Sequence, residues 1–93
     1  MTMEFEWDEA KSERVRKLRG FGFVEASHVF DGFTLEWSDI REDWGEARVV
    51  AIGEIEGLIL AVIYTDRGPV RRIITVRLAR KKEREAWLSC VRP

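Results

Sequence analysis

The sequence has little of what several common functional sites require. Cys90 is the only cysteine and His28 the only histidine. One cysteine excludes an internal disulfide framework and suits a reducing compartment, so we expect a cytoplasmic protein. A lone histidine cannot build a zinc site without cysteine or carboxylate neighbours at ligand spacing, so His28 does not by itself predict one. We expect structural roles for both side chains, and we expect no metal and no cofactor.

Long apolar runs and familiar catalytic motifs are also absent. The longest apolar run, LILAVIY over residues 58–64, is far shorter than the roughly 20 residues that a membrane-spanning helix needs. No charged segment followed by an apolar one opens the chain, so we expect no signal peptide and no membrane partner. The sequence contains no Gly-rich phosphate loop, no G-x-S-x-G and no C-x-x-C motif. It therefore does not predict P-loop, α/β-hydrolase or thiol-redox chemistry.

Charge is unevenly divided along the 93 residues, although the net charge is only −1. Residues 1–65 hold 7 Lys/Arg and 14 Asp/Glu, whereas residues 66–93 hold 9 and 3. Such a division indicates two surfaces with different partners, and a solvated basic C-terminal helix is the simpler alternative. The length and the lack of repeats or linkers predict one domain over residues 1–93.

Hydrophobic periodicity predicts an α+β fold in the order β-α-α-β-β-β-β-α. MEFEW alternates as a strand does, Asp8 suits a helix N-cap, and Gly20 suits the end of that helix. A short second helix follows, with Phe23, Ala26 and Phe30 on one face. Period-two patterns then predict four strands, within residues 33–39, 46–66 (a hairpin that turns at EIEG) and 70–78, and a last helix with its apolar stripe at Ala79, Ala86, Trp87 and Cys90. We expect a mostly antiparallel sheet with the helices packed on one face.

The last predicted strand, VRRIITVRL, is unusual because it is rich in arginine. Strand alternation places Arg71, Ile73, Thr75 and Arg77 on one face and Arg72, Ile74, Val76 and Leu78 on the other. We expect the second face to be mainly core. The first is then a cationic face, which Arg48 and Arg67 extend.

Clustered guanidinium groups suit a phosphodiester, because each presents a rigid fork to the phosphate oxygens and stays charged. The 2′-hydroxyl of RNA can act as its own nucleophile, so such a site needs a proton acceptor and no metal. Glu46, two residues from Arg48 and on its face, is the best-placed carboxylate. The alternative is a structural Glu46–Arg48 pair on a solvated strand. The indole rings of Trp7, Trp37, Trp44 and Trp87 are suited to stacking on bases, and packing in a small core is the alternative. We expect Trp7 and Trp87 to pack in the core and Trp44 to be exposed.

Five segments together resemble one protein family. They are FEWDEAK (5–11), F.EA..VFD (23–31), GEAR...IG (45–53), YTDRG (64–68) and RIITVRLARKKERE (72–85). This combination, spread over about residues 4–88, resembles the BrnT toxins of bacterial type II toxin–antitoxin modules. The resemblance implies a RelE-like fold and a ribonuclease that cleaves RNA and halts translation. It also implies neutralisation by a BrnA antitoxin with a ribbon-helix-helix DNA-binding domain, in a 2:2 complex that binds operator DNA and represses its own operon.

The cationic pattern and the resemblance together give the candidate site. We assign catalysis to Lys11, Glu46, Arg48, Arg67 and Arg77. We assign RNA binding to Thr65, Arg71, Arg72, Arg80, Lys81, Lys82 and Arg84.

One segment departs from the family pattern. After FEWDEAK the family usually shows an asparagine and then Lys-His-Gly, where this chain has Val15 and the run Leu18, Arg19, Gly20. Either catalysis does not need those polar side chains, or this chain is a weakened relative that only binds antitoxin or RNA. A non-enzymatic interaction module whose acidic half docks a basic partner is a further alternative. We expect Val15 and Leu18 to be packed in the core.

Overall fold

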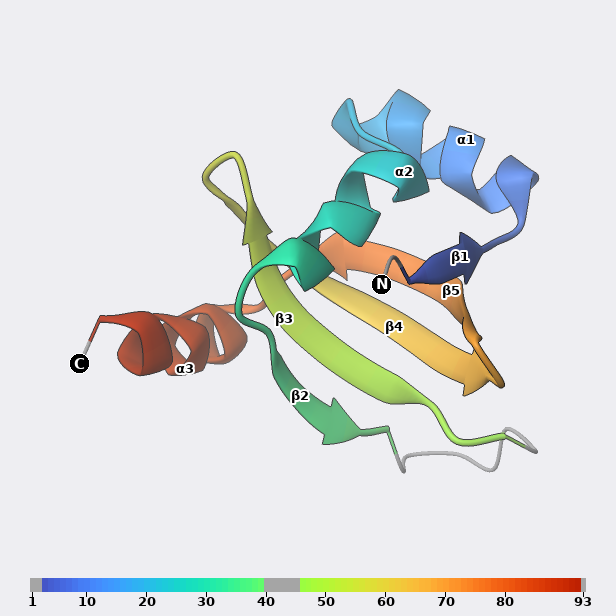
Figure 1. The fold of residues 1–93 in the computed structure, drawn as a ribbon. Helices are drawn as coiled ribbons and strands as arrows, with labels where there is room; N and C mark the ends of the chain where they lie inside the picture. Colours follow the sequence, from blue (N-terminus) through green and yellow to red (C-terminus); the bar gives the residue numbers. More distant parts are fainter. Residues whose placement is uncertain (1–2, 40–45, 93) are drawn as a thin grey trace.

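A five-stranded sheet with strand order β1-β5-β4-β3-β2 forms the centre of the protein (Figure 1). The computed structural model describes residues 3–39 and 46–92. The elements are β1 (Glu4–Glu6), α1 (Glu9–Arg19), α2 (Phe23–Ala26), the 3-10 helix η1 (Ser27–Asp31), β2 (Leu35–Ser38), β3 (Val49–Ile55), β4 (Leu58–Arg67), β5 (Val70–Leu78) and α3 (Lys81–Val91). This order confirms the predicted α+β fold, with the second helix divided into α2 and η1.

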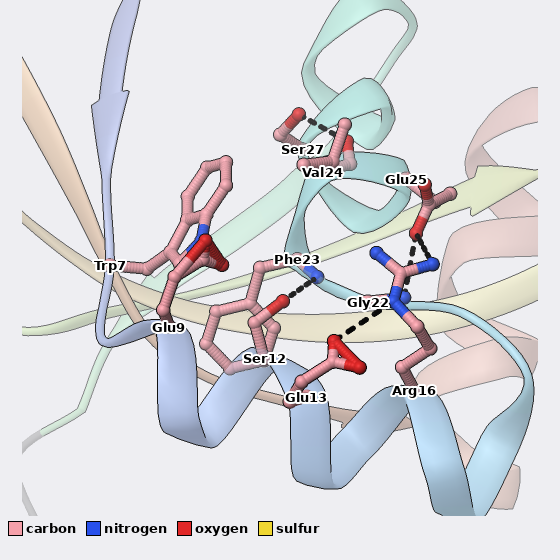
Figure 2. Close-up of polar contacts among 10 residues, drawn as sticks. All are labelled: Trp7, Glu9, Ser12, Glu13, Arg16, Gly22, Phe23, Val24, Glu25 and Ser27. Atoms are coloured by element: carbon pink, nitrogen blue, oxygen red, sulfur yellow. Dashed lines mark hydrogen bonds and ion pairs between the residues drawn. The ribbon is translucent and has the colours of Figure 1, made fainter.

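The two N-terminal helices are fixed to each other by local hydrogen bonds (Figure 2). Asp8 caps α1 as predicted, and Gly20 ends it with a φ of 84°. The buried Ser12 hydroxyl accepts a 2.9 Å hydrogen bond from the Phe23 backbone N–H, which places the start of α2 on α1. Nearby, Arg16 forms ion pairs with Glu13 and Glu25.

The central strand is β4, which pairs with β3 on one side and β5 on the other. Its residues 60–65 are buried, so the prediction of a covered central strand is confirmed. The β3–β4 hairpin turns through Glu56 (φ 46°) and Gly57 (φ 85°), at the predicted EIEG segment. Most strand pairs are antiparallel, and β1 runs parallel to β5.

Helices cover both faces of the sheet, so the prediction that they pack on one face is wrong. On one face, here the helical face, Leu60, Val62, Ile73 and Val76 pack against residues of α2, η1 and the α1–α2 connection. On the other, the α3 face, Val50, Ile52, Ala61 and Ile63 pack with Trp87. The physical reason is that β4 is apolar on both sides, and each side needs cover.

Fewer residues of the apolar stripe predicted for the last helix are buried than expected. Trp87 and the preceding Ala79 are buried, but Ala86 and Cys90 are exposed. Trp87 donates from Nε1 to the Phe33 carbonyl at 3.1 Å, and Trp7 packs edge-on to Phe23. The predicted packing roles of Trp7 and Trp87 are therefore confirmed, whereas Trp44 lies outside the described residues.

A β-bulge changes the faces of β5. Ile63 pairs with Thr75 and Tyr64 with Ile73, so Ile74 is the extra residue. The bulge reverses the alternation, which leaves Arg71 on the helical face and both Thr75 and Arg77 on the α3 face. The prediction that these three share one face is wrong. Lys11 reaches the bulge, where its Nζ donates to the Ile74 carbonyl at 3.4 Å.

Val15 and Leu18 have different environments on α1. Val15 is half-buried and packs against the core of the helical face, as expected. Leu18 is 83% exposed, so the expectation that it is packed is wrong. Phe21 and Phe23, just after the end of α1, belong to the core of the helical face instead.

Among residues 3–39 and 46–92, the structure contains no helix with the length and apolar composition of a membrane span.

Candidate functional site

Alternating charges form a continuous chain on the α3 face, at the end of the sheet where β4 ends and β5 begins. The Glu46 carboxylate lies 3.5 Å from Arg48 and 3.3 Å from Arg67. Glu6 lies 3.9 Å from Arg67 and 3.6 Å from Arg72. We call these five residues the charge chain. It has three guanidinium groups and two carboxylates.

The sheet register explains why these residues meet. Glu6 pairs with Arg72 across the parallel β1–β5 contact, and Thr65 pairs with Arg72 across β4–β5. The segment before β3 is held against β4 because the Thr65 hydroxyl donates to the Ala47 carbonyl at 2.6 Å. Thr65 itself is only 3% exposed. Its hydroxyl therefore supports the segment that carries Glu46 and Arg48.

The charge chain is accessible, because α3 covers only the opposite end of this face (Figure 1). The side chain of Arg67 is 55% exposed and that of Arg72 is 32% exposed. Glu46 and Arg48 are more enclosed, at 27% and 19%. A phosphodiester can exchange for the carboxylates as a ligand of the guanidinium groups, and a carboxylate set free in this way can accept a proton. The predicted proximity of Glu46 and Arg48 is confirmed.

Arg71 lies apart from this group, on the helical face. Its guanidinium stacks on Tyr64 at 3.9 Å from the ring centroid and forms two hydrogen bonds to Asp66, of 2.8 and 3.0 Å. Tyr64 in turn donates to Glu36, and burial, followed by this hydrogen bond, raises the pKa of the tyrosine hydroxyl. The side chain of Arg71 is only 14% exposed. It connects η1 to the sheet, because it lies over both the Phe30 ring of η1 and the Tyr64 ring of β4.

The other predicted basic residues lie near α3 or on α1. Arg77 is held by Glu83, and the Arg84 guanidinium donates to the Ala79 carbonyl. Arg80, Lys81 and Lys82 are exposed and form no salt bridge with any described residue. Lys11 belongs to the helix that packs over the opposite face. The structure therefore brings together Glu46, Arg48, Thr65, Arg67 and Arg72, and places the remaining candidates elsewhere.

The sequence interpretation did not include Glu6 in the site. Its alternation with Phe5 and Trp7 was a usable signal, because it places Glu6 on the face opposite the core. The parallel β1–β5 register that sets Glu6 beside Arg72 is a long-range feature, which the periodicity of short segments does not contain.

The remaining reactive side chains have separate positions. His28 Nδ1 is 2.8 Å from Asp31, on the exposed side of η1, and Cys90 is exposed on α3. In the part of the chain that the structure describes, no group of three or more His, Cys, Asp or Glu side chains is arranged to hold a metal ion.

Guanidinium groups gathered on an open sheet face suit phosphate ligands, because each presents a rigid fork to the phosphate oxygens. Comparison with known families identifies the family of the chain. Residues 7–83 match the family described as ribonuclease toxin, BrnT, of type II toxin–antitoxin system. The match covers well over half of the chain, which therefore belongs to the BrnT family of ribonuclease toxins. A search of curated protein sequences found no match.

Proposed function

We propose that this protein is an endoribonuclease that cleaves RNA at the charge chain and thereby arrests translation. The observation that supports this proposal is the position of Glu46, whose carboxylate lies between the Arg48 and Arg67 guanidinium groups on an accessible part of the sheet. One proton acceptor and two fixed cations are the groups that transesterification of RNA needs. Membership of a ribonuclease toxin family supports the same reaction.

The proposed reaction uses only side chains of this protein and the substrate. Glu46 accepts the proton of the RNA 2′-hydroxyl as the 2′-oxygen attacks the adjacent phosphorus. The bond from phosphorus to the 5′-oxygen breaks, and this oxygen takes a proton from water. Arg48 and Arg67 stabilise the charge on the pentacoordinate phosphorane, and Arg72 holds a neighbouring phosphate. The products are a 2′,3′-cyclic phosphate and a 5′-hydroxyl.

We further propose a BrnA-type antitoxin as the partner that neutralises the toxin. Family membership supports an antitoxin partner, because type II modules pair a toxin with a protein antitoxin. In this proposal the antitoxin carries a ribbon-helix-helix domain, and a 2:2 complex binds operator DNA through it. The division of charge between residues 1–65 and 66–93 supports separate surfaces for the antitoxin and for RNA.

The central experiment compares Glu46→Gln and Arg48→Gln with Arg19→Gln, a control at an exposed position on α1. Growth, RNA integrity and protein synthesis are followed after induced expression, and cleavage is measured with purified protein. We expect a loss of about 10²–10³ in rate for the two site variants, because Arg48 donates to the transition state and Glu46 accepts the proton of the nucleophile. Full activity of a folded Arg48→Gln variant would remove the charge chain from catalysis.

A second measurement tests the chemistry of the reaction. Cleavage in the presence of EDTA, followed by end-group analysis, should proceed normally and leave 2′,3′-cyclic or 3′-phosphate ends. Activity that disappears with EDTA and returns with magnesium would contradict the proposed mechanism.

A further inference from the structure

A groove of about 430 Å³ lies on the α3 face, between β2 and the start of α3. Its lining combines one aromatic ring, one apolar residue and several charged side chains. The lining residues are Trp37, Ser38, Asp39, Val50, Arg77, Arg80 and Glu83. None of them belongs to the charge chain.

The groove is adjacent to the charge chain. Trp37 pairs with Val50 across β2–β3, and Arg48 lies two residues before Val50 and therefore on the same face. The Asp39 N–H donates to the Arg48 carbonyl at 2.8 Å, which continues the pairing of the two segments past the end of β2. A strand of RNA that contacts Arg48 can therefore extend directly into the groove.

The groove has the chemical groups that a nucleotide needs. The Trp37 side chain lines it and remains 39% exposed, although Trp7 and Trp87 are used in packing. Arg77 is neutralised by Glu83, so Arg80 supplies the cation that forms no salt bridge among the described residues. An indole stacks on any base, and a guanidinium binds the phosphate beside it.

We propose that this groove holds one unpaired nucleotide of the RNA substrate, next to the cleavage position. Its base stacks on Trp37 and its phosphate contacts Arg80. This inference rests on the proposed ribonuclease function and adds to it a requirement for single-stranded RNA, because a base within a duplex cannot leave the stack to enter the groove without losing its pair.

The test measures binding separately from cleavage. The probe is a short fluorescent single-stranded RNA whose 2′-hydroxyls are methylated, so that the proposed nucleophile is blocked, and fluorescence anisotropy gives its Kd. We expect Trp37→Ala to weaken binding about tenfold, within the range measured for the loss of one base–aromatic stack, and Trp37→Phe to retain most of the affinity. Arg80→Gln should weaken binding and reduce its salt dependence. A duplex of the same sequence should bind less tightly than the single strand.

Matched controls separate the groove from general effects. Leu18→Ala and Arg19→Gln alter exposed side chains on α1 and should leave the Kd unchanged. Because Arg80 forms no salt bridge among the described residues, its variant tests the groove even if Trp37→Ala proves unstable in a thermal melt. Unchanged affinity in both Trp37→Phe and Arg80→Gln, together with equal binding of the duplex, would overturn the inference.

Cleavage of unmodified RNA by the wild-type protein is a separate readout for the proposed function. Wild-type protein that cleaves RNA while Trp37 and Arg80 prove dispensable for binding would refute the groove and leave the ribonuclease proposal in place. Binding that depends on Trp37 without any cleavage would refute the ribonuclease proposal and support the groove. A wild-type protein that binds no RNA would refute the groove as well.

Discussion

Arg77 and Glu83 join the last strand to the last helix through two hydrogen bonds, of 2.7 and 3.0 Å. The same Glu83 carboxylate accepts a 2.7 Å hydrogen bond from the Arg80 backbone N–H, at the start of α3. One carboxylate therefore fixes both the position and the first turn of the helix. Because Arg77 and Glu83 also line the groove, the link determines the shape of the proposed nucleotide site.

This link should make stability depend on pH. The hydrogen bonds from Arg77 lower the pKa of Glu83 below its ordinary value of 4.5. A carboxylate with a lowered folded-state pKa stabilises the protein above its unfolded-state pKa, and this contribution is lost as the pH falls through the folded value. We expect Glu83→Gln to cost about 1–3 kcal/mol at neutral pH. Thermal melts should show the difference from wild type shrinking as the pH falls below 4.5. The exposed Glu85→Gln is the control, and a difference that does not vary with pH would contradict this account.

Substitutions of the neighbouring residues Arg71 and Arg72 should affect different properties, because the two side chains lie on opposite faces of the sheet. Arg71→Gln removes a guanidinium that is stacked on Tyr64 and paired with Asp66, so we expect it to lower stability by about 1–3 kcal/mol. Arg72→Gln removes a more exposed member of the charge chain, so we expect weaker RNA binding at similar stability. Thermal melts and the RNA anisotropy assay together decide this. Weaker RNA binding in a folded, stable Arg71→Gln variant would show that Arg71 contacts RNA after all.

The junction of α1 and α2 provides a third prediction. Ser12→Ala leaves the buried Phe23 N–H without its acceptor, so we expect a loss of about 1–3 kcal/mol. For a domain of this size each 1 kcal/mol corresponds to roughly 4–8 °C in Tm. Ser27→Ala, which removes an exposed hydroxyl bonded to the Val24 carbonyl, serves as the matched control and should change Tm little. Equal Tm values for the two variants would show that the Ser12 contact does not hold the helices together.

A substitution in the β3–β4 turn should raise the stability of the protein. Glu56 adopts a left-handed conformation, with a φ of 46°, and Gly57 follows it at 85°. Two-residue turns with positive φ at both positions favour Asn-Gly, so we expect Glu56→Asn to raise stability by up to about 1 kcal/mol. The same substitution at the strand residue Glu54 should lower stability, because asparagine is unfavourable in strands. A melt in which Glu56→Asn falls below wild type would contradict this reading of the turn.

Local patterns predicted the elements well, because each depends on residues close in sequence. Asp8 and Gly20 bounded α1, and the alternation from residue 33 onward gave the four later strands. The pairing of Glu46 with Arg48 was predictable for the same reason.

Features that depend on distant segments were not predictable in this way. The Arg67–Glu46 and Arg72–Glu6 contacts require the strand order and the parallel register of β1. The position of Arg71 depends on the Tyr64 and Phe30 rings, which other segments supply. No periodicity marks Ile74 as a bulge, because an inserted residue is defined only by the partner strand.

The bulge at Ile74 determines on which side the chain leaves the sheet. If β5 kept all of its residues and paired with β4 without a bulge, Arg77 would lie on the same face as Ile73, the helical face, where Glu83 could not reach it from the present position of α3. Odd-numbered residues of β5 therefore lie on the helical face before residue 74 and on the α3 face after it. A homologue whose β5 had the same length but paired regularly would have to attach its C-terminal helix in another way, and would thereby lose one wall of the groove beside the charge chain.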